Sequence, residues 1–75
     1  MNITVTYRLT DGDFHVQIDP GQEICSGLFA LQETQRTSFK DKPDFFRSFS
    51  LRRMVSAYFT FEEAGIYSGD ILSYE

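Results

Sequence analysis

The side chains best suited to nucleophilic or metal chemistry are a single cysteine, Cys25, and a single histidine, His15. One thiol and one imidazole fall short of the ligand set of a structural zinc site, so we expect no bound metal. Cys25 lies in the first turn of a predicted helix, where the dipole lowers the pKa of a thiol, but no histidine or lysine is close in sequence to assist it. We therefore interpret Cys25 as a partly buried structural thiol and expect His15 to project from the outward face of a strand.

The carboxylates do not form a catalytic pattern either. Asp11-Gly12-Asp13 is similar to part of a calcium loop, but the later oxygen ligands and the closing glutamate are absent, so we interpret it as a hairpin turn. Any carboxylate can in principle act as a general acid or base, and nothing in the sequence singles out Asp70, Glu62 or Glu63 for that role. The sequence has no nucleophile elbow, phosphate-binding loop or dinucleotide-binding glycine pattern. We expect no catalytic residues, no cofactor and no enzymatic activity.

Length and composition limit the remaining classes of function. The chain has 75 residues, enough for one small domain. It carries 11 acidic against 7 basic residues, a formal net charge of -4, which argues against general nucleic-acid binding. One cysteine cannot form an internal disulfide, which favours a reducing compartment. No apolar run is long enough to span a membrane, and the first residues lack signal-peptide features. We expect a cytoplasmic protein without direct membrane insertion.

The first half of the chain predicts a hairpin followed by a helix. Residues 3–9 alternate between apolar and polar side chains, which is typical of a strand with one buried face. Gly12 can adopt the positive φ of a tight turn, and alternation resumes over 14–18. Ile24, Leu28 and Leu31 then follow at helical spacing, which predicts a helix from about 23 to 35. Gly27 lies on the same side and indicates close packing against the sheet.

The second half predicts short elements that complete one core. Residues 45–51 favour a strand, but two registers fit, and the sequence does not show which of Phe45, Phe46 and Phe49 point inward. A short strand over 54–56, a helical turn over 62–66 and a closing strand over 71–74 follow. We expect the strand after the helix to join the sheet in parallel with an earlier strand. The expected fold is α+β: a mixed four- to five-stranded sheet packed on one helix, in the order ββαββ, short helical turn, β.

This arrangement resembles a ubiquitin-like β-grasp domain. The resemblance is carried by the hairpin over 3–18, by Asp19-Pro20 with the helical apolar positions, and by Phe61–Leu72, in which Gly69-Asp70 introduces the final strand. It covers nearly the whole chain, and we expect residues 1–75 to form a single ubiquitin-like domain. Within this large superfamily the chain is most similar to the YukD/EsaB family, on its size and on the segment over 65–72. The resemblance implies an accessory or regulatory protein of a bacterial type VII (WXG-protein) secretion system.

Two other functions remain open at this stage. Ubiquitin and the sulfur carriers that share its fold act through a flexible C-terminal Gly-Gly, whereas this chain ends Ser73-Tyr74-Glu75. We therefore expect neither conjugation nor sulfur transfer, unless the sequence represents a modifier or carrier that lacks its tail. The alternative is a ubiquitin-like interaction domain excised from a larger protein.

Charge is distributed unevenly along the chain. Six of the seven lysine and arginine residues fall between positions 36 and 53. This stretch is either a solvated loop and edge strand, where basic side chains discourage edge pairing, or a patch that docks an acidic partner. In ubiquitin-like domains the outer face of the sheet is the usual docking surface, and the resemblance assigns that role here. The candidate docking residues are Thr4, Thr6, Arg8, Arg47, Phe49, Arg52, Arg53, Ile71 and Ser73. The expected partner is a membrane-anchored type VII component, and the oligomeric state is left open.

Overall fold

The computed structural model describes residues 1–10, 12–35 and 43–73. Its first two strands, β1 (Ile3–Leu9) and β2 (Gly12–Ile18), form the predicted antiparallel hairpin, with Ile3 opposite Ile18. Gly12 has a φ of 133°, a conformation that favours glycine, as the turn prediction requires. The apolar side chains of both strands face the core, so the period-two pattern correctly identified the buried face.

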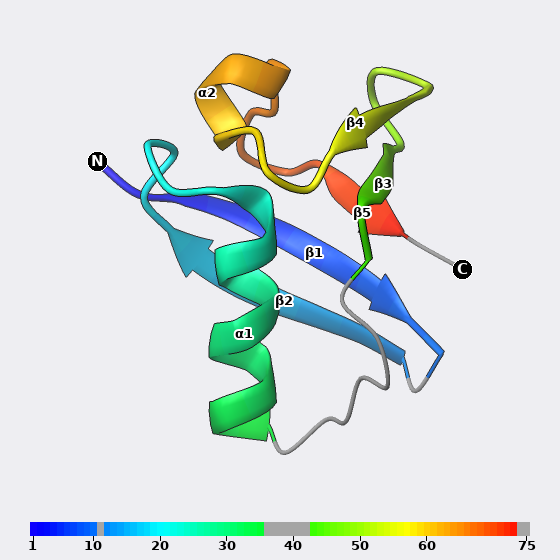
Figure 1. Cartoon of the computed structure of the whole chain (residues 1–75). Coiled ribbons are helices and arrows are strands. Elements are labelled where there is room, and N and C mark those ends of the chain that lie inside the picture. Colours follow the sequence, from blue (N-terminus) through cyan, green and yellow to red (C-terminus); the bar gives the residue numbers. More distant parts are fainter. Residues whose placement is uncertain (11, 36–42, 74–75) are drawn as a thin grey trace.

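Three short strands complete the sheet: β3 (Phe45–Ser48), β4 (Arg53–Ser56) and β5 (Ile71–Ser73). The order of the five strands is β2-β1-β5-β3-β4, as Figure 1 shows. The parallel pairing differs from expectation. The strand after the helix, β3, is antiparallel to both of its neighbours, and the parallel neighbour of β1 is the last strand, β5. The reason is that β5 inserts between β1 and β3 and bonds to both.

The strand predicted over 45–51 ends earlier, at Ser48. The amide of Arg52 donates to the Ser48 carbonyl at 2.9 Å, and the Leu51 amide donates to the Ser48 hydroxyl at 3.1 Å. These bonds close a tight turn over 49–52 in which Arg52 adopts a left-handed φ of 57°. The turn therefore takes the place of the last three residues of the predicted strand.

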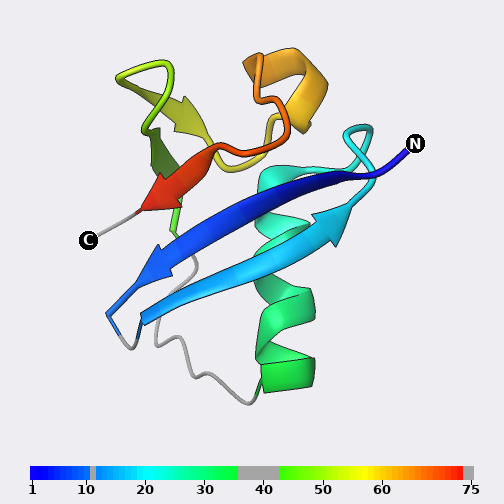
Figure 2. The same cartoon turned by 180° about the vertical axis from the view of Figure 1, so that it is seen from behind.

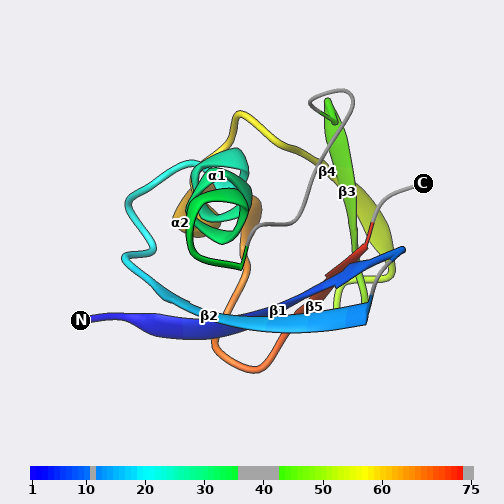
Figure 3. The same ribbon diagram turned by 90° about the horizontal axis from the view of Figure 1, so that it is seen from below.

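The main helix, α1 (Ile24–Gln35), covers one face of the sheet, as seen from below in Figure 3. Its predicted apolar positions Ile24, Leu28 and Leu31 are all buried. Phe46 is fully buried, whereas Phe45 and Phe49 are exposed, which resolves the register of β3. The ring of Phe46 meets the ring of Tyr7 edge to face, with centroids 5.7 Å apart.

The predicted helical turn is α2 (Phe61–Ala64). The Thr60 hydroxyl accepts from the amide of Glu63, and the Glu63 carboxylate accepts from the amide of Thr60, which forms a capping box. Gly65 ends the helix in the left-handed conformation, with a φ of 77°. The whole is an α+β fold with a mixed sheet on one principal helix, which confirms the predicted fold class.

Candidate docking face

The face of the sheet that is turned away from α1 carries most of the predicted docking residues. Figure 2 looks onto this outer face, with β1 and β2 in front of the helix. Thr4, Thr6 and Arg8 project from β1 on this side, because the alternate residues Val5 and Tyr7 are buried. The parallel register places Thr6 beside Ile71 and Arg8 beside Ser73. These five predicted residues therefore form one continuous surface over β1 and β5.

The same surface continues onto β3 and β4. Arg47 lies opposite Ser73, and the amide of Phe49 donates to the Ile71 carbonyl at 2.9 Å, which extends this register by one residue. Phe49 therefore lies beside Ile71.

Two further exposed side chains on this part of the face were not among the predicted docking residues. Phe45 lies two residues before Arg47 on the same side of β3, and Met54 lies directly opposite Arg47 on β4. Phe45, Phe49 and Met54 are 56%, 65% and 53% exposed. With the exposed Arg47 they form a surface that we call the aromatic-arginine patch, consisting of Phe45, Arg47, Phe49 and Met54.

Arg52 and Arg53 border this patch without belonging to it. Arg52 lies in the turn that follows Phe49, and Arg53 begins β4. Arg53 pairs with the buried Ser48, so its side chain leaves the sheet on the face opposite to Arg47, at the edge of the sheet. Within residues 1–10, 12–35 and 43–73, no carboxylate forms an ion pair with Arg47, Arg52 or Arg53. These arginines therefore present positive charge to solvent beside exposed apolar side chains.

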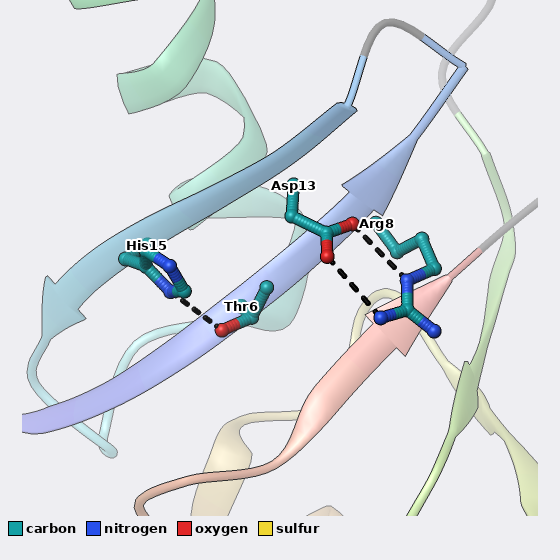
Figure 4. Close-up of polar contacts among 4 residues, drawn as sticks. All are labelled: Thr6, Arg8, Asp13 and His15. Carbon is teal, nitrogen blue, oxygen red and sulfur yellow. Dashed lines mark hydrogen bonds and ion pairs between the residues drawn. The ribbon is translucent and has the colours of Figure 1, made fainter.

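The β1–β2 end of the outer face is different, because its charges pair with each other. Figure 4 shows the Arg8 guanidinium donating to both carboxylate oxygens of Asp13, at 3.1 and 3.2 Å. The Thr6 hydroxyl and His15 Nδ1 are hydrogen-bonded at 2.7 Å. The hydrogen bond from Arg8 lowers the pKa of the Asp13 carboxyl, and the same bond raises the pKa of Arg8. Beyond the Arg8–Asp13 pair, the arginine that projects from the strands on this face is therefore Arg47 of β3.

Replacing Arg8 with glutamine is expected to raise the pKa of Asp13 toward its ordinary value, because the bond that favours the ionised carboxylate is lost. The ion pair requires an ionised Asp13 carboxylate. Its contribution to stability is therefore fully present above the ordinary pKa of an aspartate, and it is lost as the pH falls through the lowered pKa of Asp13 in the folded chain. The carbon-13 signal of the Asp13 carboxyl, followed by NMR through an acid titration, measures the change. The Arg47→Gln variant is the control, and an Asp13 pKa that moves equally in both variants would contradict the assignment.

Cys25 and His15 are the remaining candidate residues from the sequence. Cys25 is buried in the first turn of α1, and its thiol donates to Glu23 Oε1 at 3.4 Å, in agreement with the structural interpretation. His15 projects outward, as expected. Among the described residues there is no group of three or more potential metal ligands. Within the same ranges, no helix is long and apolar enough to cross a membrane.

The role of Asp70 was not anticipated from the sequence. Its carboxylate is buried and accepts hydrogen bonds from the Ser48 hydroxyl at 2.5 Å, the Ser50 amide at 3.0 Å and the Ile71 amide at 2.8 Å. These bonds fasten the 49–52 turn to the start of β5. Asp70 therefore helps to hold Phe49 beside Ile71. Because two registers fit residues 45–51, the sequence did not show that Ser48 faces inward, so no local pattern pointed to a buried partner such as Asp70.

Comparisons with known proteins identify the fold. No protein family model matches the chain, and no curated protein matches it. Among solved structures, the chain is similar to a protein designed de novo on the basis of ubiquitin, with a TM-score of 0.69 and 23% sequence identity over 99% of this chain and 87% of that one. The fold is therefore ubiquitin-like.

Proposed function

We propose that this chain is a non-catalytic docking protein that binds a protein partner through the outer face of its ubiquitin-like sheet. The observation that carries the proposal is the aromatic-arginine patch. Aromatic and arginine side chains are enriched in binding hot spots, where apolar burial supplies affinity and charge steers the encounter. In a chain with a formal net charge of -4, the exposed Arg47 of the patch, which forms no ion pair with a described residue, favours a partner with acidic residues around an apolar centre.

At a finer level, we propose an accessory or regulatory role in a bacterial type VII secretion system. The partner would be a membrane-anchored component, bound on its cytoplasmic side. The support is the sequence resemblance to the YukD/EsaB family over residues 65–72, together with the ubiquitin-like fold. The fold alone is shared by proteins of many functions, so the resemblance and the patch carry this proposal together.

The Phe49→Ser and Arg47→Glu variants are expected to lose the partner in a crosslinked pull-down from host cells. Each change removes an exposed contact of the patch, and surface substitutions of this kind change stability by only about 0.5 kcal/mol, so the bait stays folded. Loss of one hot-spot contact, about 2 kcal/mol, corresponds to a loss of about thirtyfold in affinity. The matched control is Tyr67→Ser, because Tyr67 is also an exposed aromatic, at 79%, but lies beyond α2 and outside β1–β5.

The two levels of the proposal fail separately. Equal recovery with the patch variants and with Tyr67→Ser would reject docking through the patch. Unchanged secretion and regulation of WXG-type substrates after deletion of the gene would reject the type VII role. Recovery of an adenylating enzyme would instead favour the modifier or sulfur carrier.

A further inference from the structure

A second surface lies at the free edge of the sheet, where β4 is the terminal strand. The direction of its backbone groups follows from the ladder with β3. The amide of Ala57 donates to the Asp44 carbonyl at 2.8 Å, so the hydrogen-bonded pairs of this ladder are those of Ala57, Val55 and Arg53. The intervening residues, Met54 and Ser56, therefore direct their N–H groups away from β3.

These outward amides are available for pairing. Within the described ranges, no acceptor is hydrogen-bonded to the N–H group of Met54 or of Ser56. Natural edge strands are usually protected by short length, by charged residues or proline, or by a covering segment, and β4 is only four residues long and begins with the charged Arg53. Here the two residues whose amides face outward are uncharged, and neither is a proline.

An open hollow of about 330 Å³ lies beside this edge, between β4 and the C-terminal end of α2. The two elements lie near each other at the top of Figure 1. Its apolar lining includes Met54 and Phe45 from the outer side of the sheet, and Phe59 and Ala64 from the α2 side. Phe59 is 49% exposed, so the hollow offers uncovered apolar surface as well as space for a bulky side chain. Backbone donors and a side-chain pocket at one edge are the two components of peptide recognition by strand addition.

The charges at the hollow distinguish among possible occupants. Glu63 lines it, but its carboxylate already accepts from the Thr60 amide in the capping box. Arg53 also lines it and forms no ion pair with any carboxylate in the described part of the chain. An acidic residue in the occupant would therefore complete the site. A second copy of this chain fits less well, because a four-residue strand offers far less than the about 800 Å² that each partner buries in a standard interface.

We propose that β4 receives a short extended peptide of a partner protein as a sixth strand, with one bulky apolar side chain in the hollow beside α2 and one carboxylate on Arg53. This site lies at the edge of the sheet and shares Phe45 and Met54 with the aromatic-arginine patch. Its backbone donors are Met54 and Ser56, and it does not use Arg47, Phe49 or the residues of β1.

The probe for this site is a phage-displayed library of short random peptides, selected on the immobilised full chain. The selected peptides are expected to combine a bulky apolar residue with an aspartate or glutamate. Adding a synthetic selected peptide should slow the hydrogen exchange of the Met54 and Ser56 amides, measured by NMR. The Ser56→Pro variant should bind at least about tenfold more weakly, because proline removes the outward donor and leaves the peptide acceptor unpaired.

Ser56→Ala is the matched control. It keeps the amide and removes only the hydroxyl, which accepts from the Tyr58 amide at 3.2 Å in the wild-type chain, so its affinity should stay within about twofold of wild type. An edge strand tolerates proline where its amide faces solvent, and the dispersion of the NMR spectrum checks that Ser56→Pro is folded. If that variant does not fold, Arg53→Glu serves instead, and it should weaken binding of the acidic peptides.

Three results would overturn the proposal. These are the absence of any selected peptide, equal binding by Ser56→Pro and Ser56→Ala, and peptide-induced shifts on Phe49 and Ile71 rather than on Met54 and Ser56. A concentration-dependent dimer that Ser56→Pro abolishes would assign the edge to a second copy instead. The Phe49→Ser variant separates this site from outer-face docking, because it should leave peptide binding at β4 unchanged.

Discussion

Replacing Asp70 with alanine is expected to lower the free energy of unfolding by about 3 kcal/mol. The carboxylate accepts from one hydroxyl and two backbone amides, and its removal leaves these donors without an acceptor in a region where Ser48 is fully buried. A domain of this length has a total stability of roughly 4–11 kcal/mol, so the variant should lose a large part of it.

Urea denaturation followed by circular dichroism measures this loss. Asp13→Ala is the matched control, because Asp13 is exposed and its bonds to Arg8 lie at the surface, where solvent and salt screen such pairs. Asp70→Asn should fall between the two, since the amide keeps one acceptor oxygen. A loss in Asp70→Ala no greater than in Asp13→Ala would contradict the structural role assigned to the carboxylate.

The same substitution connects stability to the docking face. The bonds from Asp70 hold the 49–52 turn against β5, so their loss should shift the NMR signals of Phe49 and Arg52 more than those of Val16 on β2. Arg52 adopts a left-handed φ of 57°, which is unfavourable for a side chain with a Cβ atom. The Asp70 network therefore helps to maintain a strained turn beside the patch.

The sequence predicted the structure best in segments where buried and exposed side chains alternate with a regular period. Alternation over 3–9 and 14–18 predicted the hairpin and its buried face, and Ile24, Leu28 and Leu31 predicted the buried stripe of α1. The same alternation placed Thr4, Thr6 and Arg8 correctly on the outer face.

The pattern was ambiguous in β3, for a physical reason. Three phenylalanines within five residues show no alternation, and the inward position after Phe46 is a serine. The hydroxyl of the buried Ser48 donates to Asp70, and these residues are 22 positions apart. No local rule could therefore predict that Phe45 and Phe49 are exposed, or that Met54 completes the patch.

Strand order also depends on information beyond local sequence. A three-residue strand has little intrinsic preference for a neighbour, and β5 is placed by backbone hydrogen bonds on both sides. The Thr6 amide donates to the Asp70 carbonyl at 3.0 Å, and the Phe49 amide donates to the Ile71 carbonyl at 2.9 Å.

The capping box of α2, in contrast, is encoded locally. Its Thr60-Phe61-Glu62-Glu63 pattern is local and was available in the sequence.

The second prediction concerns Gly27, the residue of α1 that lies against the Tyr7 side chain of β1. A Cβ atom at Gly27 would lie 3.0 Å from Cζ of Tyr7 and closer still to its hydroxyl oxygen. The hydroxyl cannot move away freely, since it donates to the Ile24 carbonyl at 2.6 Å and the ring packs on Phe46. Burial raises the pKa of Tyr7, so the hydroxyl keeps the proton that it donates.

The Gly27→Ala substitution is therefore expected to destabilise the fold by about 1–2 kcal/mol, although alanine is the better helix former by about 1 kcal/mol. Tyr7→Phe removes the oxygen that the new methyl group meets first, at the cost of one buried hydrogen bond. In the Tyr7→Phe background, Gly27→Ala should then cost at least about 1 kcal/mol less than in the wild type.

Denaturation of the two single variants and the double variant gives this coupling energy directly. The matched control is Gly21→Ala, whose Cβ atom would meet only the side-chain oxygen of Asp19, at 3.2 Å, on the exposed surface. Additive effects at Gly27 and Tyr7 would show that the helix can shift away from the sheet. A strong coupling would instead show that the spacing between α1 and β1 is fixed, which is the condition for a rigid outer face on the opposite side of the same strand.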